Sequence, residues 1–108
     1  MRKLLITLIL TLVAASPAVA APRKVKVGDD WFVRDGSATT VTVNKGKRVR
    51  WRWVGRDLHN VVVQSGPRRF QSPLKRSGRY TKKMRKRGTY RIVCSIHQPD
   101  MRMTLVVR

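Results

Sequence analysis

The chain lacks glutamate altogether and has a single cysteine, and both scarcities limit what the protein can be. Its 108 residues include 25 Lys and Arg against only 5 Asp, so the formal net charge at pH 7 is +20. One cysteine cannot form a disulfide within the chain, so the fold cannot depend on one. So strong a positive charge predicts attraction to polyanions, anionic lipid or acidic proteins, and it does not indicate a fold.

The sequence also lacks an apolar run long enough to cross a membrane. The apolar run Leu4–Ala15 has 12 residues, fewer than the roughly 18 that a spanning helix needs. It follows the basic Arg2 and Lys3 and precedes the small-residue motif Ala18-Val19-Ala20, an order that is typical of a cleaved signal peptide. We therefore expect export to the periplasm, the cell surface or the extracellular space, with cleavage before Ala21.

Cleavage there would divide the chain into a signal peptide, residues 1–20, and one mature domain of 88 residues, 21–108. Without Arg2 and Lys3, 23 basic and 5 acidic residues remain, which gives a net charge of +18. An unpaired cysteine in an oxidising compartment needs an explanation. Ligation of a metal would supply one, because it holds the sulfur as a bound thiolate.

The mature region shows no helical periodicity, and short alternating runs of apolar and polar residues predict an all-β sandwich or barrel. The clearest strand is Lys47–Val54, where Trp51 and Trp53 alternate with arginines and should face the core. Before it, Asn44-Lys45-Gly46 indicates a hairpin connection from the strand Thr40–Val43. Further strands are expected around Val25–Val27, Trp31–Val33, Asn60–Gln64, Tyr80–Met84, Thr89–Cys94 and Met101–Val107, with turns at Gly28-Asp29-Asp30 and Asp35-Gly36.

The segment Cys94-Ser95-Ile96-His97-Gln98-Pro99-Asp100-Met101 gathers three soft metal ligands within eight residues. A thiolate, an imidazole and a thioether suit copper, and a set of two histidines, one cysteine and a weak axial methionine is typical of a blue-copper electron-transfer site. The second histidine of such a set must be His59, because the chain has only two. Cys94 should end one strand and Met101 should begin the next, so their loop would be a hairpin that is held at both ends by a sheet.

Each of these residues taken alone has a plainer explanation. Cys94 could be a small buried apolar residue, His59 a packed histidine, and Met101 a filler of the core. Their combination at strand ends, in an exported β domain without a disulfide, favours metal ligation. Met103 has the same strand parity as Met101 and is the rival axial ligand. Zinc is the rival metal, although a thioether is a poor fourth ligand for it.

The chain resembles the plastocyanin/azurin-type cupredoxins, small blue-copper proteins built as Greek-key β-sandwiches. Residues 24–107 carry the resemblance, and its motifs are His59-Asn60-Val61-Val62, Gly88-Thr89-Tyr90, Cys94, His97 and Met101. The resemblance implies about seven to eight strands and one type 1 copper ion. It also implies His59, Cys94 and His97 as equatorial ligands, with Met101 as the weak axial one. Both histidines would bind through Nδ1, and the exposed edge of His97 would be the electron port.

The same resemblance gives Asn60 a role beside the ligands. In the family, the asparagine at this position hydrogen-bonds towards the residue after the cysteine, here Ser95, and such bonds orient ligands. Two features depart from many members of the family. Gln98 follows the second histidine where many members have proline, and Met103 stands where many bacterial relatives have glycine.

These observations predict an exported, monomeric carrier of one electron that is not itself an enzyme. Its redox partner should present an acidic docking surface, an anionic envelope or membrane surface is a second candidate partner, and no specific nucleic acid is expected. The alternatives are a copper store or delivery protein and a basic module that binds polyanions. The residues considered for that module are Arg48, Arg50, Arg52, Arg85, Lys86 and Arg87.

Overall fold

Eight β-strands in two sheets make up the described part of the protein. The computed structural model describes residues 21–33 and 39–108, so the predicted signal peptide and the predicted turn at Asp35-Gly36 lie outside it. Within those two ranges, no helix is long and apolar enough to span a membrane. The strands are β1 (Arg23–Gly28), β2 (Trp31–Val33), β3 (Thr40–Val43), β4 (Arg48–Trp53), β5 (Val62–Ser65), β6 (Arg79–Lys83), β7 (Gly88–Val93) and β8 (Arg102–Val107).

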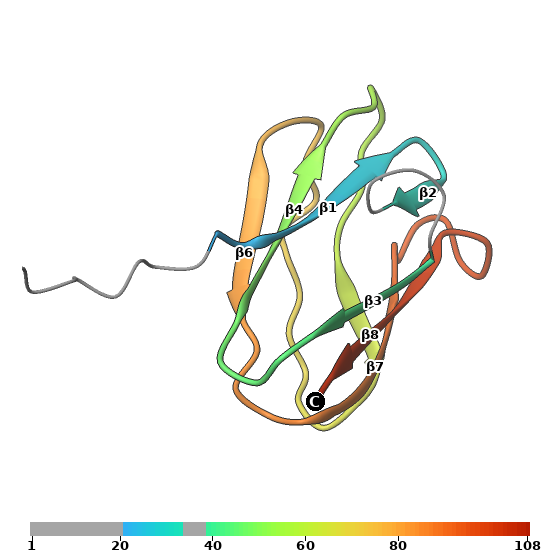
Figure 1. Cartoon of the computed structure of the whole chain (residues 1–108). Helices are drawn as coiled ribbons and strands as arrows, with labels where there is room; N and C mark the ends of the chain where they lie inside the picture. The colour runs from blue at the N-terminus through green and yellow to red at the C-terminus, as the bar shows by residue number, and fades with distance from the viewer. Residues whose placement is uncertain (1–20, 34–38) are drawn as a thin grey trace, which may run out of the picture.

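The two sheets face each other as a sandwich (Figure 1). One has the strand order β2-β1-β4-β6 and the other the order β3-β8-β7-β5. β1 runs parallel to β4 and β3 runs parallel to β8, whereas the other neighbouring strands are antiparallel. The parallel pairs join strands that are distant in sequence, so the chain returns over long connections, as in a Greek key. The predicted all-β sandwich is confirmed.

The Asn44-Lys45-Gly46 turn is not a hairpin connection, and that prediction is wrong. β3 pairs with β8 in one sheet while β4 pairs with β1 and β6 in the other, so the turn carries the chain between the sheets. It is nevertheless tight. The N–H of Lys47 donates to the carbonyl of Asn44 at 3.1 Å, and Gly46 has a φ of +89°, which glycine tolerates. Turn chemistry specifies the reversal of the chain but not the partner of the strand that follows.

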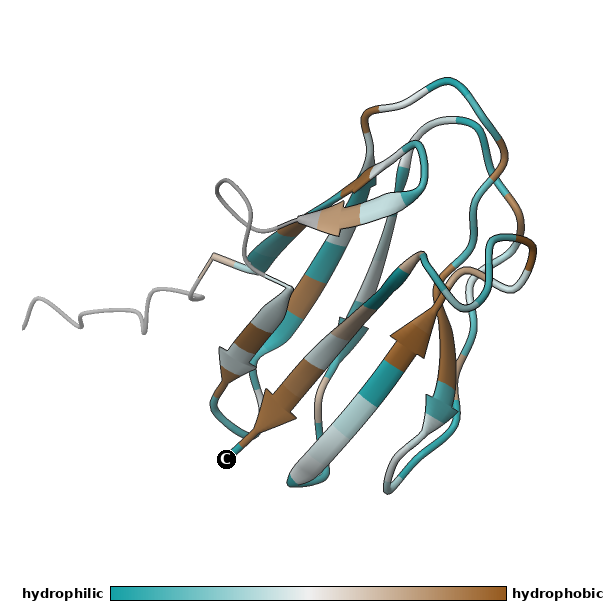
Figure 2. Ribbon diagram, turned by 90° about the vertical axis from the view of Figure 1, so that its right-hand side faces the viewer, coloured by the Kyte–Doolittle hydropathy of each residue, from teal (hydrophilic) through white to brown (hydrophobic). Residues whose placement is uncertain are grey.

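Apolar and polar residues alternate along the strands (Figure 2), and the buried side chains are the apolar ones. In β4, Trp51 is 0% and Trp53 6% exposed, as predicted from their spacing. The Trp51 ring packs against Phe70 and Tyr80, with centroids 6.0 Å away in each case. The core therefore has an aromatic centre beneath β4 and β6. This packing holds β4 in place, and the chain continues from β4 to His59.

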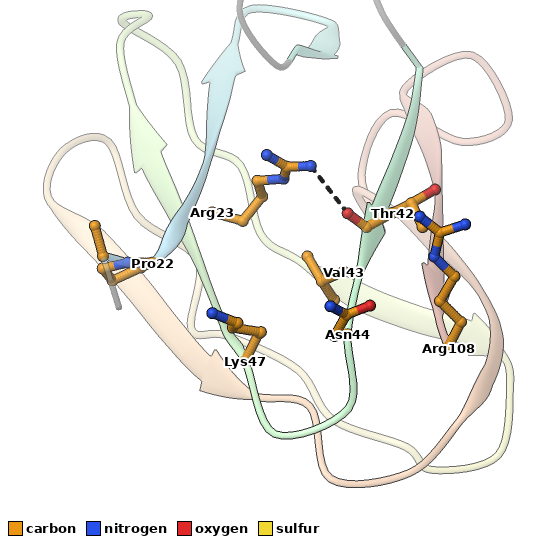
Figure 3. A pocket seen from close by; sticks show the side chains of 8 residues that line it. Pro22, Arg23, Thr42, Val43, Asn44, Lys47 and Arg108 are labelled. Atoms are coloured by element: carbon orange, nitrogen blue, oxygen red, sulfur yellow. Dashed lines mark hydrogen bonds between the residues drawn. The ribbon is translucent and has the colours of Figure 1, made fainter. Parts of the chain in front are cut away.

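The two ends of the sandwich differ in the residues that they carry. One end has a hollow of about 310 Å³ between the start of β1 and the end of β3, which Arg23, Lys47 and Arg108 help to line (Figure 3). Arg23 donates a hydrogen bond across it to the carbonyl of Thr42 at 3.2 Å. None of the predicted metal ligands lines this hollow. Those ligands follow the far ends of β4 and β7, at the other end of the sandwich.

Candidate metal centre

The backbone of His59 is held in place by hydrogen bonds from two directions. Its N–H and carbonyl pair with the carbonyl and N–H of Lys75, at 2.9 and 3.0 Å. The indole N–H of Trp53, at the end of β4, donates to the same carbonyl at 3.1 Å. His59 is fully buried, and it lies three residues before β5, which begins at Val62 and not at Asn60 as predicted. The core tryptophan therefore fixes where this imidazole enters the site.

The second segment is the loop between β7 and β8, and it is the hairpin that was predicted. Cys94 directly follows β7, and its N–H donates to the carbonyl of Met101 at 3.1 Å. Inside the loop, the N–H of His97 donates to the carbonyl of Cys94 at 3.2 Å, and the N–H of Met101 to that of His97 at 3.0 Å. Three backbone hydrogen bonds thus connect the three residues of the loop that carry soft donors.

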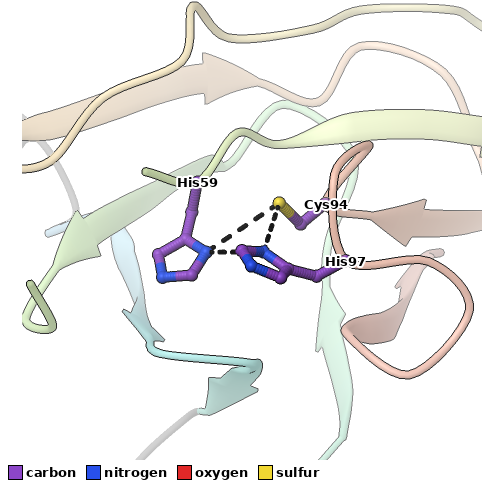
Figure 4. Close-up of side chains that lie close together, drawn as sticks. All are labelled: His59, Cys94 and His97. Atoms are coloured by element: carbon purple, nitrogen blue, oxygen red, sulfur yellow. Dashed lines mark hydrogen bonds between the residues drawn. The ribbon is translucent and has the colours of Figure 1, made fainter. Parts of the chain in front are cut away.

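His59, Cys94 and His97 bring their donor atoms together (Figure 4). The two Nδ1 atoms are 3.2 Å apart, and the Cys94 Sγ is 3.4 Å from Nδ1 of His97 and 3.9 Å from Nδ1 of His59. Donors that bind one ion at about 2.0–2.3 Å in a near-tetrahedral arrangement lie at separations of this size. The thiolate and the two imidazoles are the set that suits copper. The cluster therefore fits a single type 1 copper ion.

Both methionines of interest are buried, but they have different surroundings. Met101 is 0% and Met103 4% exposed. The Sδ of Met103 accepts a hydrogen bond from the indole N–H of Trp51 at 3.4 Å. Met101 is connected through its backbone to Cys94 and His97, as described above. Met103 thus has a partner in the aromatic core, whereas Met101 lies in the hairpin that carries the donors.

Asn60 and Ser95 connect the two segments next to the donors. The side-chain amide of Asn60 donates to Oγ of Ser95 at 2.8 Å, and its Oδ1 accepts from the backbone N–H of Ser95 at 2.8 Å. Asn60 is 6% exposed, so these hydrogen bonds are shielded from solvent. Because each residue is the neighbour of a donor residue, the pair limits how far His59 and Cys94 can separate.

Asp29, in the turn between β1 and β2, is a site residue for which the sequence predicted only a turn. Its Oδ1 lies 2.9 Å from Nε2 of His59. The carboxylate also accepts from the backbone N–H groups of Arg56 and Asp57, both in the loop that leads to His59. The hydrogen bond with His59, followed by those from Asp57 and Arg56, lowers the pKa of Asp29 to about 2.

The ionised Asp29 determines which nitrogen of His59 is free to bind a metal. A carboxylate can only accept, so the proton of a neutral His59 lies on Nε2 and the lone pair on Nδ1, which faces Cys94 and His97. One feature of the sequence distinguishes this turn: two of the 5 acidic residues of the chain are adjacent at Asp29-Asp30, directly after a strand. This feature does not identify His59 as the partner.

His97 is the one member of the cluster that reaches the surface. Its side chain is 29% exposed, whereas His59 and Cys94 are 0% exposed. Its Nε2 lies 3.5 Å from Oδ1 of Asp30, a residue with a φ of +70°, which Asp adopts more readily than most residues. The turn between β1 and β2 therefore places one carboxylate near each imidazole.

Solved structures with a similar fold include proteins that contain copper. No model of a known protein family matches the sequence, and no curated protein matches it either. An amicyanin variant in its Cu(I) form matches with a TM-score of 0.68 and 25% identity, over 84% of this chain and 87% of the other. A reduced Cu(I) amicyanin variant at pH 4 gives 0.69 and 23%, over 85% and 87%.

A copper-containing nitrite reductase, NirK from Thermus scotoductus SA-01, also matches, with a TM-score of 0.66 and 25% identity. The match covers 82% of this chain but only 22% of the reductase, so the chain spans about a fifth of that enzyme. The amicyanin matches, by contrast, cover most of both chains. The described part of the chain has the plastocyanin/azurin-type cupredoxin fold, with a histidine–cysteine–histidine cluster that fits one type 1 copper ion.

Proposed function

We propose that the protein is an exported type 1 copper protein that carries one electron, with His59, Cys94, His97 and Met101 as its ligands. The observation that carries this proposal is the convergence of two Nδ1 atoms and one Sγ from two separate segments. The copper ion, when bound, would supply the one-electron chemistry. Met101 is preferred to Met103 as the axial ligand because Met103 already accepts the Trp51 N–H.

The residues around the donors support a carrier because they hold the donor set before any metal binds. Asp29 orients His59, and the Asn60–Ser95 pair connects the two donor segments. His59, Cys94 and Met101 are all 0% exposed, so water has little access to three of the four proposed ligands. A rigid, dry donor set limits rearrangement between the two oxidation states, which favours fast electron transfer.

Electrons would enter and leave through His97, whose edge is the exposed part of the set. Ile96 beside it is 52% exposed, so the approach to His97 has an apolar element that a protein partner can cover. We propose a redox partner with an acidic docking surface, because a mature chain of net charge +18 would attract it over a long range. We further propose that the protein acts as a carrier and not as an enzyme.

The experiment that tests this function is copper loading of the predicted mature chain, residues 21–108. One copper per chain and an intense blue thiolate-to-copper(II) absorption band are expected, with reversible voltammetry and fast electron self-exchange. Cys94→Ser should abolish the colour, since a hydroxyl is a poor substitute for a thiolate. A Cys94→Ser variant that stays intensely blue would overturn the assignment. A blue protein with slow self-exchange would instead indicate copper storage or delivery.

A further inference from the structure

The outer face of the β2-β1-β4-β6 sheet collects basic side chains from three strands. Strand register pairs Lys24 with Arg50, Lys26 with Arg52, Arg48 with Lys83, and Arg52 with Arg79. Side chains of paired residues project from the same face of a sheet, and in β1 and β4 the residues between them are inward valines and a tryptophan. We call the following seven residues the basic face: Lys24, Lys26, Arg48, Arg50, Arg52, Arg79 and Lys83.

The opposite outer face shows that this concentration is not simply the result of a basic composition. There the register pairs Thr40 with Thr104 and Thr104 with Arg91, so threonines occupy much of the surface. The exposed basic residues on the strands of that sheet are only Arg91 and Arg102. Among the residues of the strands, the positive charge is therefore concentrated on the outer side of one of the two sheets.

The basic face lowers the stability of the fold when nothing is bound to it. Like charges directly opposite one another on neighbouring strands are destabilising, and four such pairs occur here. Strands β1, β4 and β6 contain no acidic residue that could compensate. On this face, one hydrogen bond joins side chains of β4 and β6: Nε of Arg50 donates to Oγ1 of Thr81, a neutral partner, at 3.3 Å. Such an arrangement is expected where an external anion supplies the missing charge.

Exposed apolar side chains lie on the same side of this sheet. Trp31 pairs with Gly28, and Gly28 projects to the same face of the sheet as Lys24 and Lys26. The indole of Trp31 lies against the Gly28 backbone, because a Cβ added to Gly28 would be 2.1 Å from the ring. Trp31 is 42% exposed. Val54, two residues beyond Arg52, is 45% exposed and helps to line a hollow of about 580 Å³ together with several residues of the basic face.

We propose that the basic face binds the surface of an anionic phospholipid membrane, with Trp31 entering the headgroup region. The basic face is the outer side of one sheet, so its charges can approach a charged surface together, and each Lys or Arg near such a surface contributes favourably. Tryptophan is the residue that most often marks the boundary between water and lipid. Grooves for single-stranded nucleic acid combine charge with several stacking aromatics, whereas this face has one indole at its edge. The proposal does not depend on copper binding.

The test compares two triple variants of residues 21–108, the part of the chain that contains all eight strands. Lys24→Gln/Arg50→Gln/Arg52→Gln removes three charges from the basic face, and Arg87→Gln/Arg91→Gln/Arg102→Gln removes three exposed charges elsewhere. Binding to vesicles of phosphatidylglycerol and phosphatidylcholine is measured by co-sedimentation. The first variant should bind about 100-fold more weakly than the unchanged chain. The second should lose no more than about threefold, because its charges lie away from the lipid.

Trp31 provides a second readout that distinguishes lipid from other polyanions. The other two tryptophans are 0% and 6% exposed, so a change in solvent exposure of an indole reports Trp31. Anionic vesicles should shift its fluorescence to shorter wavelength and protect it from acrylamide, while heparin should do neither. Equal losses in the two variants, or vesicle binding without a Trp31 shift, would overturn the proposal. The melting temperature of the basic-face variant is the control for folding. It should be higher than that of the unchanged chain, because the substitutions remove like-charge pairs between neighbouring strands.

Discussion

At the scale of the residue, the two ring nitrogens of His59 have different partners, and this division depends on Asp29. Asp29→Asn keeps an acceptor for the Nε2–H but removes a negative charge close to the copper site. We expect the reduction potential to rise, because the lost charge stabilised copper(II) more than copper(I). Asp29→Ala should additionally weaken copper binding by about 10- to 100-fold, since the ring is no longer oriented. Voltammetry and competition with a chelator measure the two effects.

Asp57→Asn is the matched control, because the exposed carboxylate of Asp57 lies in the loop that leads to His59 and makes no hydrogen bond or ion pair with the His59 ring. It changes the net charge by the same amount. If both asparagine variants raise the potential equally, the effect comes from general electrostatics, and the contact between Asp29 and His59 has no special part in the site.

The two methionines should respond differently to the same substitution. Met101→Leu should leave a blue site and raise the reduction potential, because the loss of a weak donor costs copper(II) more than copper(I). Met103→Leu should leave the potential nearly unchanged and destabilise the fold by about 1 kcal/mol, since the buried indole N–H of Trp51 loses its acceptor. Voltammetry and urea unfolding of both variants decide between them. The reverse pattern would make Met103 the axial ligand.

At the scale of the element, the turn between β1 and β2 packs so closely against the loop after β4 that only glycine fits at position 55. A Cβ added to Gly55 would lie 2.2 Å from Oδ1 and 2.9 Å from the backbone N of Asp29. Gly55→Ala should therefore push Asp29 away from the N–H groups of Arg56 and Asp57 and from His59. We expect weaker copper binding in Gly55→Ala, close to that of Asp29→Ala.

A double-mutant cycle tests whether the effect of Gly55→Ala passes through Asp29. If it does, Asp29→Ala/Gly55→Ala should bind copper nearly as Asp29→Ala alone does, so the two losses do not add. Additive losses would mean that the alanine disturbs the loop independently of the carboxylate. Titration of the metal-free variants with copper provides the comparison.

The β7–β8 hairpin that carries Cys94, His97 and Met101 could be predicted from the sequence, whereas the contact of Asp29 with His59 could not. Alternation along β7 and β8 sets which side chains face inward, so Cys94 and Met101 could be placed at the two ends of one loop from local pattern alone. The contact between Asp29 and His59 joins residues 30 positions apart, and it depends on the parallel pairing of β1 with β4, the strands that precede the two residues. No local pattern reports such a contact, and none reports that the chain passes from one sheet to the other after β3.

At the scale of the whole molecule, the charge distribution and the copper site belong to different surfaces. The basic face is the broad outer side of one sheet, whereas His97 emerges from a loop at the end of the sandwich. A carrier arranged in this way could remain on an anionic surface while its electron port stays open to a partner. The sequence supplied the amount of charge but not its placement, because the sharing of one face by β1, β4 and β6 follows from long-range pairing.

Electron transfer to an acidic partner should slow as salt rises, if the net charge of +18 steers the encounter. Steering raises association rates by about 10- to 1000-fold and falls steeply with ionic strength. Near 0.15 M salt the Debye length is about 8 Å, so only charges close to the contact still act.

Arg50→Glu should slow association at low salt and leave the blue spectrum unchanged, since Arg50 lies on the outer face of β4 and not at the copper site. The measurement is the second-order rate constant against ionic strength, with Arg91→Glu as the matched charge reversal on the opposite face. Equal slowing in both variants would mean that net charge alone steers the approach. A rate that is flat or rises with salt would mean that the positive charge does not serve the redox partner, and would leave the anionic surface as its target.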